Sequence, residues 1–291
     1  MLMKGGFETL TLILSVPCYP EKEWKFLRQF LESIMKQLQR EETNCMFTKQ
    51  TTGDRCLYYC SFPDHKKKEF TISIGQCIAE YFFDEVKKSI IPQLIHDQYQ
   101  SPYPEDMDEI KKRVDQIYST DPQMILAKKE SFAQSIHQFL EANPFMAIDG
   151  YLRFRTKPYR AWFRSIVQRA IDEYLLDREY REFIQLLKYF VSIQKSRFLC
   201  VHVIHKESKK FQLLKEDGTP IYVNELDRTF HEMISQSFSG EDFIVGALLS
   251  TAPEQVVLHT SSPEENIIRT LLQIFDGRIT LYLGCHRCFS M

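Results

Sequence analysis

A long helical stretch in the second half of the chain constrains the fold more than any other feature. Apolar residues recur at three- and four-residue spacing through two consecutive runs, from Phe163 to Leu175 and from Tyr180 to Ile193. The second run also carries apolar residues off its main stripe, as a helix buried on several sides does. The sequence therefore predicts a pair of central helices, the second of which lies in the middle of a hydrophobic core.

The chain around these helices predicts an α+β fold in three domains. Residues 1–100 are expected to form a small N-terminal α/β unit, residues 101–195 a central helical bundle, and residues 196–291 a C-terminal hairpin followed by an α-β-α-β unit. The expected linker is the loop at residues 100–104, and Asp149-Gly150 is an expected break before the central helices. In the C-terminal unit, a helix between two strands indicates a parallel pair with a crossover helix.

Within the N-terminal unit, short runs rich in strand-forming residues are mixed with helical periodicity. The expected strands are residues 9–16, 45–50, 56–62 and 69–74, and the expected helices are residues 21–38 and 79–91, with Pro92 as a kink or stop. The hairpin of the C-terminal unit is expected to join residues 211–214 to residues 221–223 around a turn that contains Gly218.

Composition narrows the classes of function. The chain has 291 residues and a net charge of -2, so any binding of anions must come from a local patch and not from overall charge. The apolar start resembles a leader, but Glu8 interrupts it and Pro17 stands where a small residue is required before a cysteine. No run of about 18 apolar residues follows. We expect a cytoplasmic protein with no membrane span.

Six cations gather between Tyr151 and Ile171, where no acidic residue occurs. They are Arg153, Arg155, Lys157, Arg160, Arg164 and Arg169. Aromatic residues alternate with them, and arginine both binds anions through two nitrogens and stacks on aromatic rings. Arg160 and Arg164 are one turn apart on a helix expected to begin near Pro158. This segment is the predicted partner-binding site.

Three interpretations of the basic segment stay open. In the first, the cations pair with a nearby acidic cluster and form an ordinary solvated face. The cluster consists of Asp172, Glu173, Asp177, Glu179 and Glu182. In the second, they bind an acidic protein partner, and in the third they bind nucleic acid through phosphate contacts and stacking. Among binding functions we expect the acidic protein partner, with nucleic acid as the alternative.

The eight cysteines are expected to be reduced, because a cytosolic chain of this size needs no disulfide framework. Cys285 and Cys288 form a Cys-x-x-Cys pair, which can chelate zinc or exchange disulfides. Two thiolates are half of a zinc site, and Cys56 with Cys60 or His202 with His205 are conceivable completions. The pair is therefore a candidate metal site with zinc as its cofactor, a thiol-redox site, or two inert thiols.

Other chemistry-bearing residues have simpler interpretations. His259 ends an expected strand, where α/β units often place functional groups, although a buried and hydrogen-bonded histidine fits equally. Glu241 and Asp242 begin an expected helix, where their charge opposes the helix dipole. We found no phosphate-binding glycine loop, HExxH motif or nucleophile elbow. These observations favour a non-enzymatic protein.

Several motifs are similar to those of the YtxC-like sporulation proteins of spore-forming Firmicutes. They are Phe139-Leu140-x-x-Asn143, Ile148-Asp149-Gly150-Tyr151-Leu152-Arg153-Phe154-Arg155-x-Lys157-x-Tyr159, Asp172-Glu173-Tyr174-Leu175, residues 179–191, Glu241-Asp242-Phe243-Ile244 with Pro253 and His259, and Gly284-Cys285-x-x-Cys288. The similarity runs from about Phe139 onward, while Thr156, Pro158 and Gly246 depart from the pattern. The resemblance implies a sporulation context and carries no biochemical activity with it.

Overall fold

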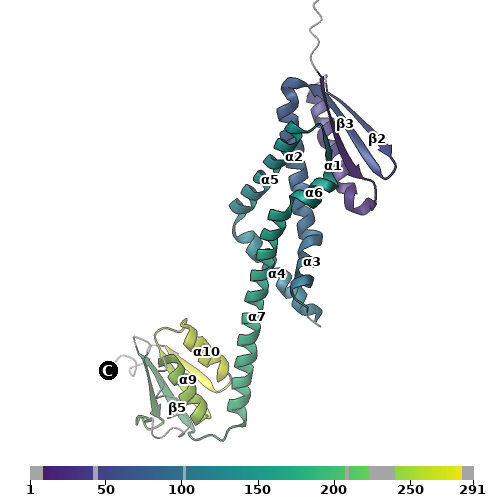
Figure 1. The fold of residues 1–291 in the computed structure, drawn as a ribbon. Helices are drawn as coiled ribbons and strands as arrows, with labels where there is room; N and C mark the ends of the chain where they lie inside the picture. Colours follow the sequence, from purple (N-terminus) through teal and green to yellow (C-terminus); the bar gives the residue numbers. More distant parts are fainter. Residues whose placement is uncertain (1–8, 42–44, 101–102, 207–209, 223–239, 284–291) are drawn as a thin grey trace, which may run out of the picture. The chain divides into compact units, whose positions relative to one another are not determined.

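The computed structural model describes residues 9–41, 45–100, 103–206, 210–222 and 240–283. Contacts divide the chain into two compact units, Met1–Leu175 and Leu176–Met291. Each unit has a four-stranded sheet and a hydrophobic core of its own (Figure 1). The predicted α+β class is confirmed. The expected boundaries after residues 100 and 195 both lie inside these units, so the division into three domains stays a prediction.

The sheet of the first unit has the strand order β2-β3-β1-β4. Its strands are β1 (Thr9–Pro17), β2 (Met46–Thr52), β3 (Arg55–Pro63) and β4 (Phe145–Ala147). β1 runs antiparallel to β3 and parallel to β4. The turn between β2 and β3 requires a positive φ of 62° at Gly53, which glycine adopts without strain. Every second residue of β3 is buried, so one face of the sheet is covered.

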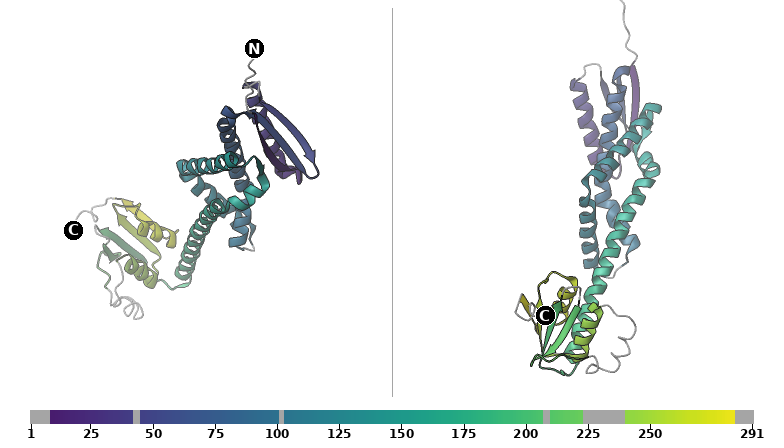
Figure 2. Two further views of the ribbon diagram at one scale, coloured as in Figure 1. Left: turned by 45° about the horizontal axis from the view of Figure 1, so that its top comes forward. Right: turned by 90° about the vertical axis from the view of Figure 1, so that its left-hand side faces the viewer.

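Helices cover that face and fill the rest of the first core. They are α1 (Glu21–Glu41), α2 (Lys67–Glu85), α3 (Ile91–Gln98), α4 (Pro104–Thr120), α5 (Pro122–Ala142), α6 (Ile148–Arg155) and the first half of α7 (Lys157–Ile193). Figures 1 and 2 show α1 and α2 side by side against the sheet. The Phe70 ring of α2 packs 4.7 Å from the Phe62 ring of β3. Phe70 thereby joins the helical layer to the sheet.

Two local predictions in the first unit are wrong, and a third is wrong in one of its alternatives. Residues 69–74 form the start of α2 and not a strand, because Phe70, Thr71 and Ile74 share one buried helical face. Asp149-Gly150 does not break the chain, since both residues lie inside α6. Of the two alternatives for Pro92, the stop is wrong, because the chain stays helical through α3, with a π-helical turn at Val86–Ile90 directly before it. The kink stays a prediction.

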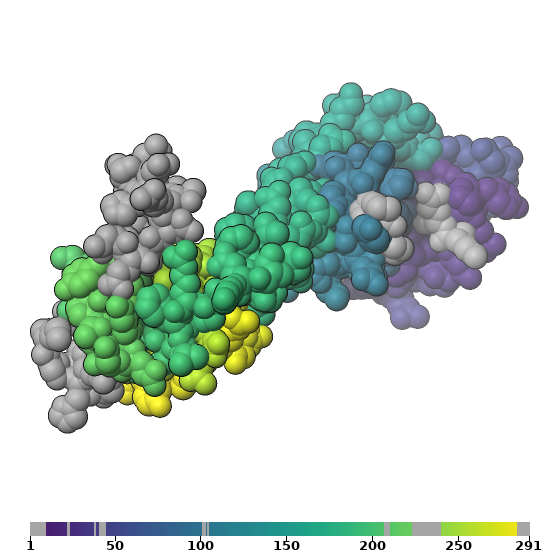
Figure 3. Space-filling model, turned by 90° about the horizontal axis from the view of Figure 1, so that it is seen from below, coloured from purple at the N-terminus to yellow at the C-terminus, as the bar shows by residue number. Residues whose placement is uncertain are grey.

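The expected pair of central helices is a single helix, α7, of 37 residues. In the space-filling view its side chains form one unbroken run, coloured teal to green (Figure 3). The prediction that its second half lies in the middle of a core is wrong. Ile184 and Val191 are buried in the second unit, whereas Leu186, Tyr189 and Ile193 are each 62% exposed. The helix thus presents apolar residues both to the core and to solvent.

The sheet of the second unit has the order β6-β5-β7-β8. Its elements are β5 (Cys200–Lys206), β6 (Lys210–Lys215), α9 (Gly240–Thr251), β7 (Gln255–Thr260), α10 (Asn266–Ile274) and β8 (Ile279–Leu283). β7 and β8 are parallel with α10 between them in the chain, which confirms the predicted crossover. α9 and α10 lie on one face of the sheet (Figure 1) and pack against Val203 and Leu258.

The hairpin of the second unit differs in part from the prediction. β6 pairs antiparallel with β5, and after the turn the chain makes one bridge, Leu214 with Pro220, in place of a strand at residues 221–222. Val223 lies outside the described residues. The six cysteines within the described ranges are free thiols. Over the same ranges, no helix has an apolar stretch long enough to cross a bilayer.

The close approach of α2 and α5 gives a prediction about stability. A Cβ atom added at Gly75 would lie 2.6 Å from the carbonyl oxygen of Ala133, so the two helix backbones would have to move apart. We expect Gly75→Ala to lower the free energy of unfolding by about 1–3 kcal/mol, as overpacking does in other cores. Urea unfolding followed by circular dichroism measures this change.

Gly150→Ala is the matched control for Gly75→Ala. Gly150 lies in helix α6, and its added Cβ would contact only the Cβ of Ala147, at an ordinary distance of 3.8 Å. Helix propensity then predicts no loss, or a gain of up to about 1 kcal/mol. Equal effects of the two substitutions would contradict the close packing of α2 on α5.

Candidate functional site

The six predicted site residues lie on two consecutive helices of the first unit. Arg153 and Arg155 occupy the last turn of α6, and the other four lie on the first half of α7. Arg160 is half-buried and the other five are exposed. We call these six residues the basic face. They are Arg153, Arg155, Lys157, Arg160, Arg164 and Arg169.

Helical periodicity separates the cations from the aromatic residues between them. Tyr151 and Phe163 are buried in the core, where Phe163 packs 5.6 Å from Phe83 and Tyr151 packs 5.1 Å from Phe139. Phe154 is an exception, being 67% exposed, and Arg153 lies 5.8 Å from its ring. The alternating aromatics predicted as part of the binding surface therefore belong mainly to the core.

Few carboxylates neutralise the basic face. Among the described residues, Arg169 alone of the six forms an ion pair, with Glu173 at 2.9 Å. Arg160 donates through Nε to the hydroxyl of Thr156 at 3.1 Å, which leaves its charge in place. Glu182 of the expected acidic cluster pairs with Arg178. Pairing among the described residues thus accounts for one cation out of six.

Spacing along α7 groups three of the cations. Lys157, Arg160 and Arg164 are three and four residues apart, so they share one side of the helix. Arg169 is five residues beyond Arg164 and points to a different side at 100° per residue. Together with its bond to Glu173, this sets Arg169 apart from the rest of the basic face.

The acidic side chain that precedes the basic face in the sequence is already engaged elsewhere. Asp149, at the start of α6, accepts hydrogen bonds from Arg55 of β3 at 2.5 and 3.3 Å. Partial burial alone would raise the pKa of the Asp149 carboxyl, but the bond and charge of Arg55 outweigh burial and hold that pKa below its ordinary value. Asp149 is therefore ionised and bound to Arg55, and it does not pair with Arg153.

Two cavities adjoin the basic face. Arg153, Phe154 and Arg160 line a cavity of about 500 Å³, whose other walls include Trp24 and Tyr81. This arrangement brings one cation of α6 and one of α7 to a common concave surface. It is the part of the basic face at which a protruding acidic group of a partner would contact two guanidinium groups.

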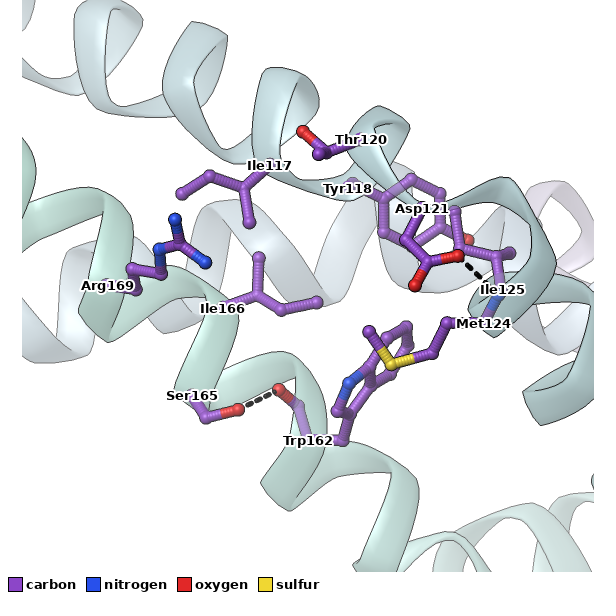
Figure 4. Close-up of a pocket in the computed structure, with 10 residues that line it drawn as sticks. All are labelled: Ile117, Tyr118, Thr120, Asp121, Met124, Ile125, Trp162, Ser165, Ile166 and Arg169. Atoms are coloured by element: carbon purple, nitrogen blue, oxygen red, sulfur yellow. Dashed lines mark hydrogen bonds between the residues drawn. The ribbon is translucent and has the colours of Figure 1, made fainter.

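The second cavity, of about 350 Å³, lies at the Arg169 end of the basic face. Figure 4 shows Ile166 and Trp162 along its wall, with Arg169 at one end and Asp121 at the other. The Asp121 carboxylate caps α5 by accepting from the Met124 backbone N–H at 2.9 Å. With Asp121 used as a cap and Arg169 paired to Glu173, this cavity offers no unengaged charge.

The C-terminal metal-site prediction falls partly outside the described residues, because Cys285 and Cys288 are not among them. Of the completions expected from sequence, His202 and His205 do not come together, since His205 bonds to the Thr260 hydroxyl at 2.9 Å. Cys60 is buried in the first unit, and burial raises the pKa of its thiol, which disfavours a thiolate ligand.

A histidine pair that the sequence did not predict occurs in the second unit. His202 Nδ1 of β5 lies 3.0 Å from His259 Nε2 of β7. The two residues are 57 positions apart, and the parallel register of β5 with β7 brings them together. The sequence places one histidine in each of two expected strands. It does not show that these two strands pair, so the contact between the histidines could not be predicted.

The comparisons with known proteins identify the family. Residues 72–280, more than half of the chain, match the model of the YtxC-like family, and the chain belongs to this family. The chain is also similar to the Bacillus subtilis (strain 168) protein named Uncharacterized protein YtxC, with 30% identity over 159 residues, or 54% of this chain and 55% of that protein. The match thus spans about half the length of that relative. No solved structure matches the chain.

The Arg55–Asp149 pair gives a prediction about pH. Because the pKa of Asp149 is lowered in the folded state, the stability it contributes is present above the ordinary carboxyl pKa and is lost as pH falls through the lowered value. We expect Arg55→Gln to cost on the order of 1 kcal/mol near neutral pH, and the cost to shrink steadily in acid. Urea unfolding from about pH 7 to about pH 3 measures this.

Arg164→Gln is the control for this pH series, since Arg164 has no carboxylate partner among the described residues. Its effect on the free energy of unfolding should be small and nearly constant across the series. An Arg55→Gln cost that does not decrease in acid would show that Arg55 stabilises the chain by packing and not through Asp149.

Proposed function

We propose that this chain is a sporulation-associated binding protein of the cytoplasm, without catalytic activity, whose basic face captures an acidic protein partner. The observation that carries the proposal is that five of the six cations have no carboxylate partner among the described residues. The sporulation context rests on the resemblance of the family and not on the geometry. Uncompensated guanidinium groups held on helices favour binding of carboxylates.

A protein partner fits this face better than nucleic acid does. Binding of single strands combines cations with exposed aromatic rings on which bases stack. Here Tyr151 and Phe163 are buried, and Phe154 is the exposed aromatic residue of the segment. Strong binding of a duplex would require many phosphate contacts, and the chain as a whole carries a net charge of -2. The basic face is of a size suited to a few acidic side chains.

Charge reversal at two exposed positions tests the proposed function. Arg155→Glu combined with Arg164→Glu should leave folding unchanged, because neither side chain has an internal ion-pair partner among the described residues. Recovery of an acidic protein from sporulating cells by the tagged full-length chain should fall at least about tenfold, since two attractive contacts become repulsive. Quantitative mass spectrometry of the recovered proteins measures the change, and spore yield of the variant strain should fall with it.

Arg181→Glu is the matched control, because it reverses the charge of an exposed arginine on α7 outside the basic face. It should recover the same partner as the unmodified chain. Equal recovery with the double variant would contradict the proposed surface. Loss of all recovery after nuclease treatment, with a steep dependence on salt, would assign the basic face to nucleic acid instead.

We propose metal binding through Cys285 and Cys288 as a second function, with thiol-redox chemistry as its alternative. The observation that favours metal is the His202–His259 pair, because imidazole nitrogens are zinc ligands. This second function is independent of the basic face.

A further inference from the structure

The second half of α7 has two apolar sides, and one of them contributes to the core of the second unit. Ile184 and Val191 are buried in that core, and Leu187 packs against it. On the other side, large apolar residues are between 45% and 65% exposed. They are Leu176, Phe183, Leu186, Tyr189, Phe190 and Ile193.

Five of these exposed residues occupy the two apolar positions, a and d, of a seven-residue repeat. They are Leu176, Phe183 and Phe190 in position a, and Leu186 and Ile193 in position d. We call these five residues the outer row. At 100° per residue, the outer row lies about a third of the way round the helix from Ile184 and Val191. This spacing is typical of a helix that packs against a second helix.

The exposed apolar area suits a second copy of this chain. Together the outer row and Tyr189 expose on the order of 600 Å², estimated from their exposed fractions and the size of aromatic and aliphatic side chains. A two-fold pair uses the same patch twice, so two copies would bury about 1,200 Å², the lower end of the range for specific interfaces. An apolar patch of about 600 Å² is at the upper limit for a protein that stays monomeric.

The outer row is complementary to itself when two copies of the helix lie antiparallel. In that orientation, position a of one helix lies level with position d of the other. Phe183 then faces the partner's Leu186, and Leu176 faces the partner's Ile193. At the centre of the contact each aromatic ring packs against an aliphatic side chain, and such alternation of larger and smaller side chains fills the space between helices.

Glu179 favours the antiparallel orientation over the parallel one. It is exposed and occupies the first d position of the repeat, where the outer row has no apolar residue. In a parallel pair the two Glu179 carboxylates would lie level with each other in the contact and repel. In the antiparallel pair they are about 16 Å apart along the helix axis. A single polar residue in such a repeat sets the orientation at some cost in stability.

We propose that a second copy of this chain pairs with the first along the outer row, with the two α7 helices antiparallel. All the residues of this contact belong to the second unit. The pairing is independent of the proposed function of the basic face, whose six cations belong to the first unit.

Sedimentation equilibrium of the full-length chain tests the pairing. At tens of micromolar the unmodified protein should have twice the 34.5 kDa of one chain. Leu186→Glu should weaken the dimer at least about a hundredfold, because each dimer would bury the new carboxylate twice. Leu126→Glu is the matched control, since Leu126 is an exposed leucine on α5 of the first unit, and it should stay dimeric.

Glu179→Leu tests the same surface by a gain of affinity and does not depend on the disrupted variant folding. It completes the repeat with a sixth apolar residue and removes a carboxylate from each side of the contact. The dimer should become at least about tenfold tighter in the same sedimentation measurement. Circular dichroism checks that each variant keeps its helix content.

Disulfide cross-linking tests the orientation. A chain carrying Leu176→Cys and a chain carrying Ile193→Cys should form a mixed disulfide when oxidised together, because these two positions face each other in the antiparallel pair. Leu176→Cys alone should show no more cross-linking than the unmodified chain, since its two copies would be about 25 Å apart.

Three results would overturn the proposal. A monomeric unmodified chain at tens of micromolar would exclude the pairing itself. Dimers that survive Leu186→Glu and are not tightened by Glu179→Leu would place the contact elsewhere on the chain. Efficient cross-linking of Leu176→Cys with itself would contradict the antiparallel orientation.

Discussion

The continuity of helix α7 is the constraint on which the rest of the structure depends. Its first half contributes Phe163 and Val167 to the core of the first unit, and its second half contributes Ile184 and Val191 to the core of the second. A helix that packs along one side must present its remaining side chains to solvent. Four of the six cations of the basic face lie on its first half, and the exposed Leu186 and Tyr189 lie on its second half. The same helix therefore carries exposed residues of different chemistry in the two units.

Periodicity in the sequence was enough to predict most helices and strands. It was not enough to predict which sides of them another element covers. The alternation in β3 and the strand-helix-strand order of β7, α10 and β8 are local patterns, and both predictions are confirmed. Residues 69–74 were misassigned because a short apolar run fits a strand and a buried helix equally. The second half of α7 was misassigned because apolar spacing shows that residues share a side, while burial depends on whether another element packs there.

For the candidate site, the sequence located the cations but did not predict which of the residues between them are buried. Local composition identified the six cations, and the structure leaves five of them without a carboxylate among the described residues. Their aromatic neighbours were assigned to the same surface, although helical geometry turns Tyr151 and Phe163 inward. The partner of Asp149 is Arg55, 94 residues earlier, and His202 meets His259 across 57 residues. Contacts of this kind follow from strand pairing, which one sequence does not specify.

The helical support of the basic face bears on how selective the proposed binding would be. Lys157, Arg160 and Arg164 are spaced along one side of a helix whose backbone is already ordered, so binding orders side chains and not backbone. A partner whose carboxylates repeat at three- and four-residue spacing on its own helix would meet all three at once. A disordered acidic segment would have to order its backbone first, at a cost of about 1–2 kcal/mol per residue. For the proposed acidic partner, the geometry of the basic face therefore favours one that is folded before it binds.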